Sequence, residues 1–211
     1  MTTNEKAGLA LIVASIATFG VLALHPTGRD VLDAAAAGTS NALDRGVHLV
    51  AIGAEAILLA GMLGLALRLT TQRDLAMGSF VVYAVAIAAL VIAATASGLI
   101  APSAAWRVAQ SQGAARDIAL AGFQFSGYIT QSFARVGFSL ASLAVVGFSV
   151  AMYLDGFSRA LGSYGVILGV AGIIGFDVMN VSGQMHGFAG LAMAGQLVWT
   201  IWAGLLLRRV A

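Results

Sequence analysis

The chain lacks cysteine and is poor in charged residues. Of its 211 residues none is Cys, two are Pro and 9% are charged. The absence of Cys excludes disulfides, thiolate metal sites and thiol redox chemistry. Lys occurs once, at Lys6, so no apolar run contains a Lys that could carry a Schiff base. The net charge of +2 and the scattered basic residues argue against nucleic acid as a partner.

What the chain has in abundance is apolar sequence. Hydrophobic residues make up 60% of it, and the mean hydropathy is +0.94. Soluble domains carry about 25% charged residues, and an apolar run of about 20 residues is enough to span a bilayer. We therefore predict an all-α, polytopic membrane protein with one domain over residues 1–211. The first apolar run is predicted to be an uncleaved helix, because Ala35–Ala37 lies too far from it to be a signal-peptide cleavage site.

Breaker and polar residues divide the apolar sequence into six predicted transmembrane spans. The spans cover approximately residues 7–24, 47–69, 75–100, 130–154, 163–181 and 187–207. Between the third and fourth spans, residues 102–129 mix aromatic and aliphatic residues with Arg, Asp and Gln. This mixture predicts an interfacial helix over 102–129, at the edge of a six-helix bundle.

An even number of spans places both termini on the same side of the membrane. That side would carry six basic residues and the other side four. The positive-inside rule then predicts cytoplasmic N- and C-termini. The layout is similar to that of small six-helix bacterial inner-membrane proteins. This likeness implies the inner membrane as the location and no particular activity.

Three charged residues are predicted to share one layer in the outer third of the membrane. Glu55 lies two helical turns below His48 on the same helix face, Arg135 is early in the fourth span, and Asp177 is late in the fifth. A charge at the bilayer centre costs at least about 2.5–3.5 kcal/mol, so these side chains should turn inward. We predict a Glu55–Arg135 pair, with Asp177 as a second acceptor. The alternative is a purely structural lock between helices.

Three histidines lie at the predicted outer ends of spans: His25, His48 and His186. Imidazole is the commonest protein metal ligand, and with Asp177 nearby the set suits zinc, copper or iron. A b-type haem between His48 and His186 ranks behind a non-haem site, because both residues lie close to the surface. Taken singly, each His is also explained as an interfacial anchor. No known metal-binding spacing is present.

The residues predict an outward-facing His, carboxylate and Arg pocket that binds a metal ion or protons. The protein would then be a small membrane metalloprotein or a transporter. In an enzyme, Glu55 would act as general base and Arg135 would stabilise an anion. Two alternatives remain open: an accessory subunit of a larger or self-associated membrane complex, and a protein that binds lipid or another hydrophobic ligand. The sequence specifies neither a substrate nor whether the protein is an enzyme.

Overall fold

The protein is a bundle of helices, and its fold class is the predicted one. The computed structural model describes residues 1–25, 28–39, 41–177 and 186–209, apart from the side chains of residues 28, 177 and 186–189. No strand occurs among the residues described. The elements are α1 (Thr3–Leu24), α2 (Gly28–Ala36), α3 (Ala42–Arg68), α4 (Arg73–Thr95), the π-helix η1 (Ala96–Ile100), α5 (Ala101–Gln110), α6 (Gly113–Leu154), α7 (Arg159–Asp177) and α8 (His186–Arg209).

Six helical segments in the described structure are long and apolar enough to cross a membrane. Each covers most of one of the six predicted spans, so the chain is a multi-pass membrane protein. Several helices begin or end well beyond the predicted bounds, because polar turns of helix continue past the apolar part. The end of the predicted fifth span, residues 178–181, lies outside the described residues.

Local sequence signals explain where the helices begin and end. α1 starts with a capping box, in which the Thr2 hydroxyl accepts from the Glu5 backbone N–H and the Glu5 carboxylate accepts from that of Thr2. α6 ends before Gly156, whose φ of 74° suits a residue without a Cβ. Gly113 has a φ of 54° and allows the tight reversal from α5 into α6.

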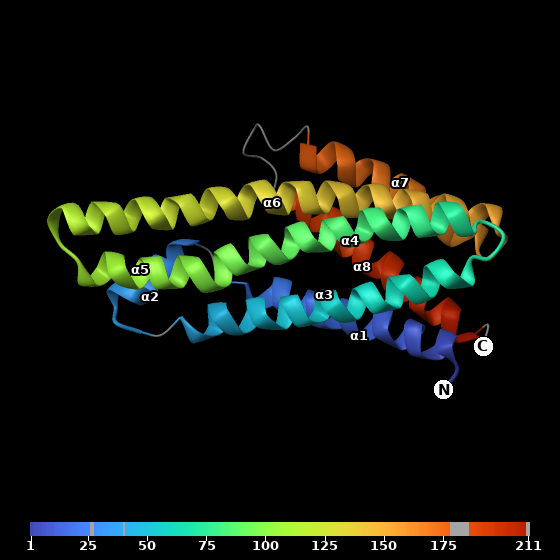
Figure 1. Cartoon of the computed structure of the whole chain (residues 1–211), viewed down its shortest axis with the longest axis horizontal. Coiled ribbons are helices and arrows are strands. Elements are labelled where there is room, and N and C mark those ends of the chain that lie inside the picture. The colour runs from blue at the N-terminus through green and yellow to red at the C-terminus, as the bar shows by residue number, and fades with distance from the viewer. Residues whose placement is uncertain (26–27, 40, 178–185, 210–211) are drawn as a thin grey trace.

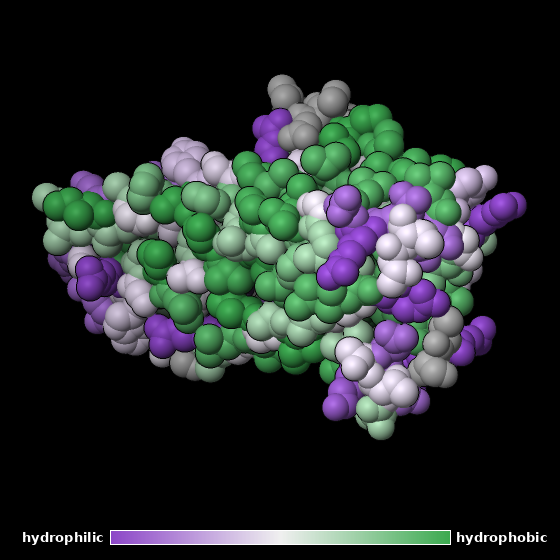
Figure 2. All heavy atoms as spheres, turned by 45° about the vertical axis from the view of Figure 1, so that its right-hand side comes forward, coloured by the Kyte–Doolittle hydropathy of each residue, from purple (hydrophilic) through white to green (hydrophobic). Residues whose placement is uncertain are grey.

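The spanning helices form a closed ring. α1 packs on α3, α3 on α4, α4 on α6, α6 on α7, α7 on α8, and α8 on α1. Figure 1 shows both termini at one end of the bundle, which we call the arginine end. It carries Arg68, Arg73, Arg159 and Arg208. The opposite end of the spans, where α1 ends and α3 begins, is called the histidine end. Figure 2 shows a broad hydrophobic band between hydrophilic ends, as expected for a protein embedded in lipid.

Residues 102–129 are helical, but they do not form the separate interfacial helix that was predicted. α5 continues α4 through η1, and residues 113–129 are the first part of α6. α6 has 42 residues and is therefore about 63 Å long, about twice the hydrocarbon thickness of a bilayer. α5 and the start of α6 thus extend the bundle as a hairpin beyond the histidine end (Figure 1). A small core of Val31, Ala35 and Ala105 attaches α2 to this hairpin.

Close packing dominates the arginine half of the bundle. Gly8 of α1 lies directly against the carbonyl of Gly204 in α8, and Gly61 of α3 lies against Leu11 of α1. Small residues allow helix backbones to approach in this way, which is a main source of helix association in membranes. At the arginine end, the Asp155 carboxylate accepts a hydrogen bond of 2.9 Å from the Thr71 backbone N–H, and also one from the Thr71 hydroxyl. These bonds join the α3–α4 turn to the end of α6.

Candidate ligand-binding cavity

A cavity of about 350 Å³ lies inside the histidine half of the ring. Residues of α1, α3, α4, η1, α6 and α8 line it. Its walls include Met62 and Val145, which are fully buried where the close-packed half begins. Toward the histidine end the lining includes the exposed side chains of Leu22 and His25. The bundle is therefore solid in one half and hollow in the other.

The lining is mainly apolar, with polar groups at a few positions. Sixteen of its 25 residues are Ala, Val, Leu, Ile, Met or Phe. No Lys or Arg occurs among these lining residues, and Glu55 supplies their one carboxyl group. A few polar groups in an apolar concave surface are typical of small-molecule sites, because the apolar area gives affinity and the polar groups fix orientation.

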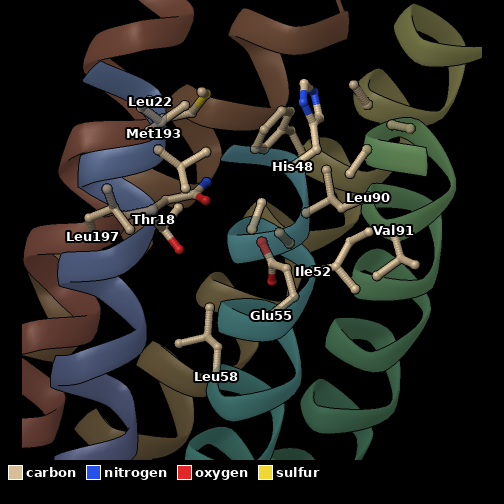
Figure 3. A pocket seen from close by; sticks show the side chains of 18 of the residues that line it. Thr18, Leu22, His48, Ile52, Glu55, Leu58, Leu90, Val91, Met193 and Leu197 are labelled. Carbon is tan, nitrogen blue, oxygen red and sulfur yellow. The ribbon is translucent and has the colours of Figure 1, made fainter. Parts of the chain in front are cut away.

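Glu55 lies on the cavity face of α3. That face also carries His48, Ile52 and Leu58, at the spacing of one helix stripe. Figure 3 shows the Glu55 carboxyl directed into the space between α3 and α1, facing the side of α1 that carries Thr18. Its Oε2 atom is buried and has no hydrogen-bond partner in the described structure. The carboxyl group is therefore directed at the cavity rather than used in holding helices together.

His25 and His48 meet at the histidine end of the cavity. Their Nε2 atoms are 3.1 Å apart, and the rings meet edge to face with centroids at 4.7 Å. Nδ1 of His48 lies 2.7 Å from the Asp44 carbonyl oxygen and 3.2 Å from the Asp44 Oδ1 atom. A carbonyl oxygen can only accept, so His48 carries a hydrogen on Nδ1. In neutral His48 the Nε2 lone pair then faces His25, which donates its own Nε2 hydrogen.

The π-helix η1 places a glycine against this histidine pair. A Cβ added at Gly98 would collide with Cβ and Cγ of His48, so only glycine leaves room for the imidazole. π-helical turns inside α-helices are rare and are frequent at functional sites. The next residue toward α4, Ser97, lines the cavity. The widened turn thus shapes both the histidine pair and the cavity wall.

The predicted Glu55–Arg135 ion pair is not formed in the described structure. Ion pairs occur there between the N-terminus and Glu5, Arg29 and Asp33, and His48 and Asp44. The reason lies in the rotation of α6, which turns Ala134 and Phe138 toward the cavity. Arg135 follows Ala134 by about 100° around the helix and is not part of the lining. It is half-buried and has interactions elsewhere.

Two of the predicted metal ligands lie outside the described side chains. These are Asp177, at the end of α7, and His186, at the start of α8. The ring of Phe138 stacks on that of Phe176 at 5.0 Å, so the backbone of Asp177 is near the stretch of α6 that carries Arg135. Among the described residues, no group of three or more His, Asp or Glu is placed to hold a metal ion. The predicted ligand set is thus represented by His25 and His48 alone.

Several polar residues of the lining were not singled out from the sequence. Thr18, Gln196 and Thr200 face the cavity from α1 and α8. A signal for the α8 residues was available, because Gln196 and Thr200 are one turn apart in an otherwise apolar span. Asp44 does not line the cavity, and it contacts His48 from the preceding turn of α3 at the i, i+4 spacing.

The chain has no significant match among known proteins. No family model matches the chain, and neither a curated protein nor a solved structure is significantly similar to it. The fold and the cavity define a class: a polytopic, helical membrane protein with a ligand-sized internal cavity. Any narrower assignment depends on the chemistry of that cavity.

Proposed function

We propose that the protein binds a small, mainly apolar ligand within the membrane, and that the ligand enters from the histidine end. The observation that carries this proposal is the cavity itself. Its volume of about 350 Å³ falls in the range of ligand pockets, which is roughly 300–1,000 Å³. Protein interiors normally leave few voids larger than a water molecule. A bundle with a purely structural role would have filled this space, as the arginine half does.

The cavity suits a carrier in an outward-facing state, or a receptor. The arginine end carries more basic residues than the histidine end. We propose that the arginine end and both termini face the cytoplasm. The histidine end would then face outward. The large exposed apolar side chains of α1, such as Ile16 and Phe19 at 60% exposure each, suit contact with lipid or with another membrane subunit.

The proposed function is tested by filling the cavity. Ala134 lines it from α6, and a Leu at this position would occupy part of the space. We expect small apolar compounds to bind the wild-type protein in lipid nanodiscs, measured by calorimetry against empty nanodiscs. Ala134→Leu should lose that binding. Leu143→Ala, on an exposed stretch of the same helix, is the matched control and should bind normally. Binding that is unchanged in Ala134→Leu would contradict a site in this cavity.

A second candidate function is a transition-metal site at the histidine pair. Two imidazoles bound to one tetrahedral ion at about 2.0–2.1 Å would have their nitrogens slightly more than 3 Å apart, near the separation observed here. Asp44 behind His48 resembles the carboxylate–histidine–metal arrangement that orients ligating imidazoles. His186 and Asp177 remain the proposed further ligands for zinc, copper or iron. A haem would need space between His48 and its axial partner, and His25 occupies that side of the His48 ring.

The metal proposal is tested by titrating the purified protein with zinc, copper(II) and iron(II). We expect stoichiometric binding that is lost in His25→Gln and His48→Gln. Asp44→Asn should weaken it by about 10–100-fold, the usual effect of removing an outer carboxylate. Asp33→Asn, which alters an exposed carboxylate on α2, is the control and should bind as the wild type does. Binding that survives both histidine substitutions would exclude this site.

A further inference from the structure

The threonine hydroxyls of the cavity already use their hydrogens within their own helices. The Thr18 hydroxyl donates to the Ala14 carbonyl at 2.9 Å, and the Thr200 hydroxyl donates to the Gln196 carbonyl at 2.8 Å. A hydroxyl has one hydrogen and two lone pairs. The oxygens of Thr18 and Thr200 can therefore offer a ligand only lone pairs. Thr130 is used in the same way, since it donates to the carbonyl of Ser126 at 2.9 Å.

The amide of Gln196 is oriented by a short chain of hydrogen bonds. The Ser142 hydroxyl donates to the Phe138 carbonyl at 2.8 Å, so its oxygen needs a donor. Gln196 Nε2 provides that donor at 2.7 Å. This bond distinguishes the two ends of the amide, which are otherwise difficult to assign. With one hydrogen of its Nε2 donated to Ser142, Gln196 adds to the lining an acceptor, its Oε1 atom, and one further N–H.

Glu55 adds a carboxyl group, which can carry a negative charge, to this set of acceptors. Its buried Oε2 atom has no hydrogen-bond partner in the described structure, and the lining contains no Lys or Arg. A carboxylate in an apolar, membrane-embedded space is costly unless a cation or a proton neutralises it. The donors of the lining are few: the hydroxyls of Tyr83 and Ser97, the second amide hydrogen of Gln196, and the histidine pair, whose hydrogens are shared with each other and with Asp44.

We infer that the ligand of this cavity is a lipophilic organic cation with N–H donors, such as a protonated primary amine on a compact hydrocarbon body. This inference rests on the proposed function and names its ligand class. The ammonium group would pair with Glu55 and donate to the threonine and glutamine oxygens, while the hydrocarbon body contacts the aliphatic lining. An anion would find few donors, no Lys or Arg, and the carboxylate of Glu55. A neutral hydrocarbon would leave the Glu55 carboxyl group without a partner.

The inference is tested with three compounds that share one body: 1-adamantylamine, 1-adamantanol and 1-adamantanecarboxylate. Binding to the protein in lipid nanodiscs is measured by calorimetry at pH 7. We expect the amine to bind at least tenfold more tightly than the alcohol, and the carboxylate to bind more weakly than either. Glu55→Gln should remove the difference between amine and alcohol. Glu5→Gln, which alters the other glutamate of the chain at the exposed start of α1, is the matched control and should retain the difference.

The outcomes separate this inference from the proposed function. If amine and alcohol bind equally well and Ala134→Leu abolishes both, the cavity binds ligands but has no preference for cations, and the inference is wrong. Tighter binding of the carboxylate would also overturn it. If none of the three compounds binds, both the inference and the proposed function fail for ligands of this size. An amine preference that persists in Glu55→Gln would exclude Glu55 as the partner of the cation.

Discussion

The two halves of the bundle are built from the same six helices but differ in what lies between them. In the arginine half, Gly8 meets Gly204, Gly61 meets Leu11, and the large side chains of Phe148 and Trp199 are fully buried. In the histidine half, the same helices separate around a cavity of about 350 Å³. Thr18 of α1 and His48 and Glu55 of α3 are polar side chains that line this cavity.

The difference shows that overall hydrophobicity does not decide where a helical membrane protein is solid. Both halves are apolar, so lipid tails compete equally well for both surfaces, and close contact depends on small residues. Glycine opposite a backbone or an aliphatic side chain closes the arginine half. In the histidine half such a contact also occurs between Gly137 of α6 and Leu90 of α4, but Gly98 accommodates an imidazole. The close-packed half thus closes one end of the cavity, where Met62 and Val145 are buried.

The largest expected effect comes from adding one methyl group to the close-packed half. In Gly8→Ala the new Cβ would meet the Gly204 carbonyl oxygen, and would lie 2.7 Å from Cγ of Arg208. The backbone oxygen cannot move aside, so α1 and α8 must separate. We expect a loss of about 1–3 kcal/mol, the usual cost of overpacking, measured by reversible unfolding in mixed micelles.

Gly20→Ala is the matched control on the same helix. A Cβ at Gly20 would meet no atom within 4 Å, so the substitution should leave stability unchanged or raise it through better helix propensity. Equal stabilities for the two variants would show that the contact between α1 and α8 is not close, and the contrast between the halves would lose its basis.

A smaller effect is expected where the glycine faces a side chain instead of backbone. In Gly98→Ala the methyl group would displace the His48 ring and break its contact with His25. We expect a loss of about 0.5–1.5 kcal/mol, the net contribution of one hydrogen bond. The chain has only three histidines, so the imidazole ¹H–¹⁵N spectrum reports the pair directly.

The control for this prediction is Gly78→Ala in α4, where an added Cβ has open space. Its imidazole signals should match those of the wild type. Unchanged His25 and His48 signals in Gly98→Ala would mean that η1 does not hold the pair in place.

The fold class could be predicted from the sequence because hydrophobic length is a strong and local signal. Runs such as residues 75–100 are too long and too apolar for any other structure. The extension of α6 to Gly113 could not be predicted in this way. Arg116, Asp117 and Gln124 interrupt the hydropathy of that stretch, yet they occupy the outer faces of a continuous helix.

The candidate site was predictable in part. The pairing of His25 with His48 follows from the order of the spans, because the end of α1 and the start of α3 lie at the same end of the bundle and the two helices pack together. The Glu55–Arg135 pair was not predictable in this way, because the depth of the two residues in the membrane does not fix the rotation of the helices that carry them. A shift of one residue, from Ala134 to Arg135, turns a side chain about 100° away from the cavity. The cavity itself could not be predicted, because it depends on how five helices are spaced around it.

The smallest stability change is expected from filling the cavity. Ala134 and Ala144 lie on α6 ten residues apart, one beside the cavity and the other in the hydrophobic core, at 1% exposure. In the core a larger side chain has no space, so Ala144→Leu should cost about 1–3 kcal/mol. Beside the cavity the added carbons gain contacts, and Ala134→Leu should be neutral or stabilising by less than about 1 kcal/mol. Unfolding measurements on both variants compare the halves directly. A loss in Ala134→Leu as large as in Ala144→Leu would mean that the histidine half is as densely packed as the arginine half, and the cavity would then be too small for a ligand.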